Sequence, residues 1–567
     1  MRMVPIGVPA PHDRPRSAAD RFGGLAAALF GLCVVHAMFG ASILPPDHAG
    51  WMLSGRIGPD PVQYWLGWTA FARDGWHWPP GANPGWGMEL ASSIFFSDSI
   101  PLLAFLFKAL RPIVEVPQYW GLWIYACGAL QAAMAWGLLG RATRDPLARL
   151  AGAGLFVLQP LLLGRLGGHF ALGGQFLILA GLWLCVVPGA GPRRGLAWTA
   201  LVLVTSLVQA YLLVMVGALW AADWLGRVVG SPRSGAAGSG VEAVAVPAAA
   251  LTGLWAGGFF LLDGGFGGTW GGFGQMQLDL LAPFDPGYWG GILPDLGTAE
   301  HMEAGNSYPG LGALLVIGGG LVAWLVHPRA PRRRDVVLLL MLVALLGFAV
   351  SHSVLLGGHE VAALSLPASV IERADALRAS ERFFWPVLYA ALFGACVALV
   401  RGLGSRRTGY VLAAALLIQV ADLRPGAARL QDFFVPQPPS LPLRLADPFW
   451  AEAASRYDAV RVVPTGMQAR HWEEVAVYAV SLGLRTDAVY LARLDPHAVA
   501  GVNATVAQRL EQGDHEPRTF YVLGDRAALM RAVAGMSPSS DLLGRFDGIW
   551  VLAPGWRDQV AANSAAR

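Results

Sequence analysis

Charged residues are scarce in this chain of 567 residues: they make up 14% of it, whereas hydrophobic residues make up 55%. A soluble domain usually carries about 25% charged residues, so this composition excludes an ordinary soluble protein and indicates a membrane protein. The 22 tryptophans fit that class, because indole rings favour the membrane–water interface. The net charge is only +3 and we find no basic tract with interleaved aromatics, so nucleic acid is not expected as a partner.

Cysteine is also rare, and no fixed repeat period is found. The four cysteines (Cys33, Cys127, Cys185 and Cys396) all lie in apolar runs without CxxC spacing. This excludes a disulfide framework and a zinc site, and predicts small buried apolar side chains. The glycine-rich stretch DGGFGGTWGGFG lacks the GK[ST] of a phosphate-binding loop. It is either a flexible hinge or a mobile aromatic lid with Phe266, Trp270 and Phe273.

Long apolar runs are abundant. A membrane-spanning helix needs about 20 apolar residues, and we predict about eleven spans. We read 196–226 as two helices folded at Gln209, and the first run as a retained anchor. The predicted spans are 23–44, 118–140, 148–164, 170–188, 196–208, 210–226, 242–262, 309–327, 335–352, 383–401 and 408–422.

The arginines predict how these spans are oriented. With residues 1–22 in the cytoplasm, most arginines between spans fall on the inner side, as the positive-inside rule requires. The predicted transmembrane domain, 23–422, then has two long outer loops, 45–117 and 263–308. Within the first loop, we expect 95–112 to form an interfacial or re-entrant helix. The acidic residues gather in the outer loops, which the insertion rule does not explain.

The composition of the chain changes after Asp422. Residues 423–446 read as a proline-rich linker, and 447–567 as a soluble α/β domain with a mostly parallel sheet. An odd number of spans would place this domain outside, in the periplasm. The expected strands are DAVRVVPT, DAVYLARL, TFYVLG and GRFDGIWVLAP, and the expected helices are HWEEVAVYAVSLGL, HAVAGVNATVAQRLEQG and RAALMRAVAG.

Ionisable residues are nearly absent from the middle of the predicted spans, where transporters usually place them. His36 and a few glutamines are the main polar residues there, and hydrogen bonding between helices accounts for them. The carboxylates lie instead in loops at the water–lipid boundary. This placement suits chemistry on a substrate with an apolar tail and a polar head.

Asp60 is the strongest single candidate for a catalytic residue. It lies between Pro59 and Pro61, which restrict the backbone just before a predicted helix. One interpretation is an N-cap, with Pro61 at the first helical position. The other is a general base that deprotonates an acceptor hydroxyl, with Tyr64 and Trp65 stacking on sugar and excluding water.

Two further acids follow in the same loop. Asp98 precedes another predicted helix start at Pro101, so helix capping is again the rival interpretation, and Glu89 lies nine residues before it. Asp60 and Asp98, brought together, would form a pair that holds the acceptor or a divalent cation such as Mg²⁺ or Mn²⁺.

The order of these parts resembles the GT-C class of membrane glycosyltransferases: a first span, a long outer loop with an early acid, an interfacial helix, many further spans and an outer domain. Several motifs more closely resemble a bacterial membrane family called domain of unknown function 6311. They are DPVQYWLGW, GMELASSIFFSDSIPLLAFLFKAL, QYWGLW, GRLGGHFALGGQFLIL, FDPGYWG, MEAGNSYPGLG and LRASERFFWPVLY.

The GT-C resemblance implies that Asp60 is the catalytic base and Asp98 the second acid of the outer face. It also implies a sugar donor linked to a polyprenyl phosphate, whose phosphate needs a cation. Arg378 and Arg382 are well placed for this role, because arginine binds phosphate bidentately, although both could instead snorkel to the interface beside Glu381.

Three more residues are candidates for substrate binding. Arg165 and His169 lie in GRLGGHF at the outer end of a span, and Glu303 lies in MEAGNSYPGLG. A lone histidine at the interface is more often structural, and Glu303 is equally open to capping a turn. This chain departs from the GT-C pattern, since the usual pair of adjacent acids is absent around Asp60. That departure leaves metal dependence open.

The sequence thus predicts a polytopic α-helical, GT-C-like membrane protein of a bacterial inner membrane. Its expected activity is transfer of a sugar from a polyprenyl-phosphate donor to an envelope glycan or lipid acceptor at the periplasmic face. Two alternatives stay open: a flippase or transporter of lipid-linked glycans, and a non-catalytic envelope scaffold.

Overall fold

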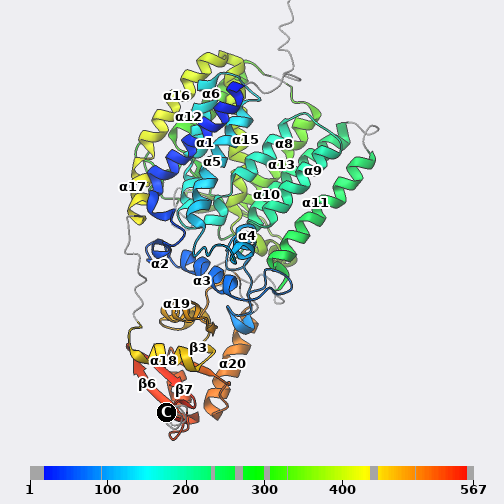
Figure 1. The fold of residues 1–567 in the computed structure, drawn as a ribbon. Coiled ribbons are helices and arrows are strands. Elements are labelled where there is room, and N and C mark those ends of the chain that lie inside the picture. The colour runs from blue at the N-terminus through cyan, green and yellow to red at the C-terminus, as the bar shows by residue number, and fades with distance from the viewer. Residues whose placement is uncertain are drawn as a thin grey trace, which may run out of the picture.

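The structure is a computed structural model that describes residues 18–90, 92–230, 236–261, 272–298, 307–328, 330–434, 445–491, 493 and 495–558. It has two parts, a helical bundle (residues 18–434) and a C-terminal module (residues 445–558). In Figure 1 the long helices of the bundle pack side by side, the C-terminal module lies beyond one end of them, and α3 lies between the two parts.

The main helices of the bundle, α17 excepted, coincide with the predicted apolar runs. They are α1 (Ala18–Phe39), α5 (Trp120–Leu139), α6 (Pro146–Val157), α7 (Pro160–Leu166), α8 (Phe176–Val186), α9 (Pro192–Ser206), α10 (Ala210–Gly230), α11 (Ala236–Gly257), α12 (Leu311–Val326), α13 (Arg333–Val350), α15 (Phe384–Leu403), α16 (Ser405–Asp422) and α17 (Arg424–Phe433). The break predicted at Gln209 is present, since its side-chain oxygen accepts from the Tyr211 backbone N–H at 2.6 Å as α10 begins.

Two predicted boundaries in the bundle were wrong. The run 148–164 is not one helix, because α6 and α7 meet at a 53° bend at Pro160, where proline removes a backbone donor. The predicted linker 423–446 begins with α17, which continues from α16 through a second 53° bend. Residues 435–444 of that linker lie outside the described part of the chain.

Within the described residues, five helices are long and apolar enough to cross a membrane, or seven if each bent pair counts as one span. By length and composition the chain is therefore a helical membrane protein with several spans. The predicted number of about eleven spans, which includes shorter helices such as α12, stays a prediction, as does the side on which each loop lies.

Shorter elements lie between these helices. They are η1 (Ala41–Ile43), α2 (Gly50–Leu53), α3 (Asp60–Arg73), η2 (Met88–Leu90), α4 (Pro101–Leu110), η3 (Phe170–Gly173), η4 (Phe259–Leu261), η5 (Ala282–Phe284), β1 (Ser353–Leu356), β2 (His359–Ala363), α14 (Ala368–Ala374), η7 (Asp375–Leu377) and η8 (Ser380–Phe383). The helix predicted in 95–112 is α4, which begins at Pro101 and has ten residues, too few to span the membrane. Most of the glycine-rich stretch, residues 262–271, lies outside the described residues.

The C-terminal module is a five-stranded sheet covered by helices. Its elements are α18 (Pro448–Arg456), β3 (Ala459–Val463), η9 (Gly466–Gln468), α19 (Trp472–Leu482), β4 (Arg485–Thr486), α20 (Pro496–Gln512), β5 (Thr519–Leu523), α21 (Arg526–Gly535), β6 (Leu542–Phe546) and β7 (Ile549–Ala553). The strand order is β4-β3-β5-β7-β6. Successive side chains of a strand alternate between the two faces, and both faces of β3 and β5 are buried.

The predicted mostly parallel sheet was wrong in one half. β3 pairs in parallel with β4 and β5, but β5–β7 and β6–β7 are antiparallel. The segment GRFDGIWVLAP is a hairpin and not one strand, because Asp547 and Gly548 adopt positive φ angles of 47° and 83° that reverse the chain. The segment DAVYLARL is not a strand either, since β4 ends at Thr486 and the chain then leaves the sheet.

Candidate active site

Asp60 and Tyr64 are placed by α3. This helix begins at Asp60, with Pro59 at the N-cap position and Pro61 in the first turn, where its missing N–H costs nothing. Residues four apart lie on the same helix face, so the two side chains are neighbours. Asp60 keeps 27% of its side chain exposed, while Tyr64 is buried.

Asp98 is brought to α3 by the segment 97–99, here called the serine turn. Gly67 of α3 permits a close approach, since a Cβ added there would lie 2.3 Å from the Ser97 Cβ. The turn is tied to the helix by the Gln63 side chain, which donates to the Phe96 carbonyl at 3.2 Å, and by the Ser99 hydroxyl, which donates to the Tyr64 carbonyl at 3.3 Å. As a result the half-buried Asp98 carboxyl accepts a hydrogen bond from the Tyr64 hydroxyl.

The serine turn is strained. Asp98 has a φ of 52° and Ile100 a φ of 50°, in the left-handed region that β-branched residues rarely enter. Each such residue costs about 1–3 kcal/mol and persists where its surroundings hold it, often at functional sites. Ile100 occupies the N-cap position of α4, so Asp98, two residues earlier, does not cap that helix.

His169 and the C-terminal module complete the surroundings of Asp60. His169 follows α7 and places its Nε2 3.4 Å from the Asp60 carboxylate. The Tyr490 hydroxyl of the C-terminal module donates a hydrogen bond to the same carboxylate. Asp60 therefore faces groups from α3, from the turn after α7 and from the module, which are far apart in the sequence.

Arg378 and Arg382 lie in the segment 378–383, here called the arginine segment. The Arg382 guanidinium stacks over the Tyr211 ring with its carbon 4.7 Å from the ring centroid. The Tyr211 hydroxyl accepts from the Ala379 backbone N–H at 3.2 Å. Arg378 has a buried Nη1 with no hydrogen-bond partner among the described residues.

The charges of these groups influence one another. Burial and then the charge of Asp60 raise the pKa of Asp98 to about 7, although Arg382 and the hydrogen bond from Tyr64 act in the opposite direction. Burial and the charges of both acids hold the pKa of Tyr64 well above its usual range. Tyr64 thus remains a hydroxyl donor, and Asp98 changes its charge near neutral pH.

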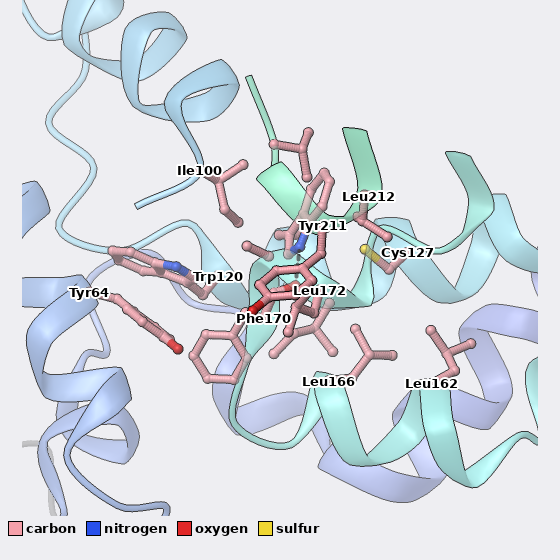
Figure 2. Close-up of a cluster of buried hydrophobic side chains, with 14 of the residues drawn as sticks. Tyr64, Ile100, Trp120, Cys127, Leu162, Leu166, Phe170, Leu172, Tyr211 and Leu212 are labelled. Atoms are coloured by element: carbon pink, nitrogen blue, oxygen red, sulfur yellow. Dashed lines mark hydrogen bonds between the residues drawn. The ribbon is translucent and has the colours of Figure 1, made fainter. Parts of the chain in front are cut away.

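An apolar cluster forms the floor of this site and explains the burial. In Figure 2 the rings of Tyr64 and Trp120 lie face to face, with Phe170 beside Tyr64 and Tyr211 farther in. The Tyr64 ring centroid is 6.5 Å from that of Trp120 and 5.5 Å from that of Phe170. Such a floor excludes water, which strengthens electrostatic interactions above it.

Several residues predicted for the site lie elsewhere or serve the packing. Arg165 and Glu381 form a buried ion pair at 3.4 Å, which fastens the arginine segment to α7. Glu89 binds Arg461 of the C-terminal module at 2.5 Å, and Trp65 is buried in the apolar core. Glu303 lies outside the described residues.

Tyr490 and Arg493 are the residues that sequence reasoning missed. The Arg493 Nη2 donates to the Ala376 carbonyl at 3.0 Å, two residues before Arg378. Both residues belong to DAVYLARL, whose alternation of apolar side chains indicated a strand. In the structure they lie just beyond the end of the parallel strand β4, a position where α/β folds often place binding residues, but the sequence did not mark that end.

No group of three or more His, Cys, Asp and Glu residues is arranged to hold a metal ion within the part of the chain that the structure describes. Asp60 and Asp98 alone do not make up a protein metal site of the usual kind, although Mg²⁺ can be held by two carboxylates together with substrate phosphate. A divalent cation at these acids stays a prediction.

The arrangement defines a class of protein: a helical membrane protein that carries a cluster of acids, arginines and tyrosines at one end of its bundle. The chain belongs to the family described as Domain of unknown function (DUF6311), whose model matches residues 28–424. Residues 449–554 match the DUF6311 C-terminal domain. The family predicted from the sequence motifs is thereby confirmed.

Curated proteins and solved structures provide two further comparisons. No curated protein matches the chain. Among solved structures, the crystal structure of ArnT from Cupriavidus metallidurans in the apo state is similar at 11% identity and a TM-score of 0.44, over 95% of this chain and 98% of that one. Because both values are low, function is inferred below from the side chains of this chain.

Proposed function

We propose that this protein is a membrane glycosyltransferase of the GT-C kind. It moves a sugar from a polyprenyl-phosphate donor to an envelope glycan or lipid acceptor at the periplasmic face of the bacterial inner membrane. The observation that carries the proposal is the convergence of Asp60 and Asp98 with Arg378 and Arg382 at the end of an apolar bundle. A lipid-linked sugar phosphate needs this combination of a base, a cationic phosphate site and an apolar surface.

In the proposed reaction Asp60 takes the proton of the acceptor hydroxyl. The acceptor oxygen forms a bond to the sugar C1 as the bond from C1 to the phosphate oxygen breaks, and its electron pair stays on the phosphate. Arg378 and Arg382 bind that phosphate, whose negative charge increases as it leaves. Most of the rate acceleration then comes from positioning and from stabilising this charge.

The remaining groups orient Asp60 and the acceptor. His169 and Tyr490 hold the Asp60 carboxylate from two sides. Tyr64 holds the Asp98 carboxyl, which provides a second acceptor for sugar hydroxyls beside the base. The exposed fraction of Asp60 leaves room for the hydroxyl that it deprotonates.

A transporter of lipid-linked glycans is less well supported. Such a protein needs a polar path along its helices, whereas the stretch of α10 from Tyr211 to Asp223 contains no other ionisable residue. The buried acids farther along are paired with arginines: Asp223 binds Arg194 at 2.6 Å, and Glu242 binds Arg227 at 2.5 Å. This ion cluster, about 18 Å from Tyr211 along the helix axis, fits helix packing better than passage of a headgroup. A scaffold would not require Asp60 and Asp98 to converge.

The test is transfer from a panel of radiolabelled polyprenyl-phosphate sugars to envelope acceptors, in membranes with matched expression. We expect Asp60→Asn to lower the transfer rate by about 10²–10⁴-fold, because the general base is lost. Asp47→Asn is the matched control, since Asp47 is an exposed carboxylate of the same outer loop. Equal transfer by all three proteins would reduce Asp60 to a helix-start residue. No transfer from any donor by the wild type would favour the transporter.

A further inference from the structure

The C-terminal module is docked on the outer loop that carries both acids. Arg73, in the last turn of α3, donates to the carbonyls of Val480 and Ser481 at the end of α19, at 2.6 and 2.7 Å. The Gly87 backbone N–H donates to the Thr486 carbonyl at 2.9 Å. These bonds fix the module to the end of α3 and to the middle of the segment that connects α3 with the serine turn.

An ionic cluster around a buried arginine adds to the docking, with the exposed Glu89 as its partner from the bundle. Arg461, 2% exposed in the middle of β3, binds Glu89 of the bundle at 2.5 Å. It also binds Asp487 and Glu516 of its own module, at 3.0 and 2.7 Å. The bundle thus contributes one of three carboxylates to a guanidinium in the module core, which makes the contact specific in position and angle.

The docked position delivers two side chains to the site. The chain leaves the sheet after Thr486, and the Tyr490 hydroxyl then donates a hydrogen bond to the Asp60 carboxylate. Three residues later, Arg493 donates to the carbonyls of Asp375 and Ala376, at 3.4 and 3.0 Å, at the beginning of the stretch that carries Arg378.

Three guanidinium groups therefore gather at one place. Burial and the charges of Arg378 and Arg382 lower the pKa of Arg493, although Tyr211 and Asp375 act in the opposite direction. The buried Arg378 Nη1 has no hydrogen-bond partner among the described residues. Like charges held together with an unused buried donor are offset when an anion binds between them.

We propose that the C-terminal module is a part of the active site, and that its Arg493 joins Arg378 and Arg382 to form one phosphate pocket across the contact between module and bundle. This proposal rests on the proposed function for the identity of the anion. A donor phosphodiester carries one negative charge, whereas the departing phosphate monoester carries about 1.5–2 at pH 7. A third cation accordingly favours the leaving group over the donor, which is how an enzyme raises kcat.

The test measures binding and needs no transfer. Full-length protein in detergent is titrated with decaprenyl phosphate and, separately, with decaprenol, which has the same chain without the charge. The ratio of the two affinities isolates the charge of the phosphate. We expect Arg493→Gln to lower this ratio about tenfold or more, because one charge-assisted contact is lost. Arg526→Gln, an exposed arginine of the same module, should leave it unchanged.

Each outcome is decisive. If Arg493→Gln lowers both affinities equally, Arg493 only holds the module in place and the proposal is overturned. It is equally overturned if the ratio matches that of the wild type. Arg493→Lys, which keeps the charge, should recover most of the ratio and covers the case in which the glutamine variant fails to fold. If Asp60→Asn retains transfer while Arg493→Gln loses the ratio, the pocket stands and the assignment of the base falls.

Discussion

At the scale of single residues, Asp98 is the acid of the site whose protonation is shifted into the neutral range. Its pKa is raised from 3.8 to about 7, so the folded protein binds this proton more tightly than the unfolded chain does. Between about pH 4 and pH 7 the stability contributed by Asp98 therefore falls as the pH rises, because ionising it beside Asp60 without full solvation is unfavourable. The site keeps a residue that costs stability at neutral pH, as functional sites often do.

We predict that Asp98→Asn stabilises the folded protein, and that it does so more at pH 8 than at pH 5, because the cost of the raised pKa of Asp98 grows between about pH 4 and pH 7. The amide cannot ionise, and it can still accept the hydrogen bond from Tyr64. Melting curves in detergent should show the variant roughly 2–5 °C above the wild type at pH 8, with transfer reduced. A melting difference that does not depend on pH would contradict the raised pKa of Asp98.

The sequence could identify some residues of the site and not others. Asp60 stood out because two prolines flank it, and the arginines of LRASERFFW because they precede an apolar run. Tyr490 and Arg493 carry no such local mark. Their role arises from contacts with Asp60 and Ala376, far away in the sequence, and no periodicity records such contacts. Glu89 is the opposite case. It is close to Asp98 in the sequence, which suggested a shared site, but in the structure it pairs with Arg461 of the module.

At the scale of elements, the packing of the serine turn on α3 decides where Asp98 lies. An alanine usually stabilises a helix by about 1 kcal/mol over glycine. At Gly67 the added methyl group would meet the Ser97 Cβ at 2.3 Å and its hydroxyl at 2.4 Å, so the turn must move. We predict that Gly67→Ala lowers both the melting temperature and the transfer rate, the latter by at least about tenfold, because Asp98 leaves Tyr64.

Two further variants separate this effect from helix propensity. Gly217 in α10 has open space where a Cβ would be, so Gly217→Ala should be neutral or stabilising. Adding Ser97→Gly to Gly67→Ala removes the opposing Cβ and should restore part of the transfer. If the single variant Gly67→Ala transfers sugar as the wild type does, the serine turn does not position Asp98.

Elements were predicted well where one local signal dominates. Apolar runs located the long helices, and Pro101 marked the start of α4. The prediction failed where a turn carried the information: the Asp547–Gly548 pair makes a hairpin, so two antiparallel strands replaced one. The Asp-Gly signal was available in the sequence. No signal in the sequence marked the early end of β4, because the residues after Thr486 leave the sheet through contacts with the bundle.

At the scale of the whole molecule, the docking of the module should control the site from a distance. We predict that Arg73→Ala, which removes two hydrogen bonds to the end of α19, speeds amide exchange at Gly87 and Thr486 and weakens binding of decaprenyl phosphate several-fold. Arg56→Ala, at an exposed position of the same loop, is the control. Unchanged exchange at Gly87 would mean that the remaining contacts hold the module without Arg73.

The contribution of the module to the site also sets a time order for the newly made chain. Asp60 leaves the ribosome about 430 residues before Tyr490, which at usual rates of synthesis is an interval of roughly 20–90 s. Throughout that interval the nascent protein holds its acids beside an incomplete phosphate pocket. Only when the last fifth of the chain has folded against the bundle can the three arginines meet. A truncated chain without the module lacks Tyr490 and Arg493 and is therefore inactive. Incomplete synthesis then releases no partly active enzyme into the membrane.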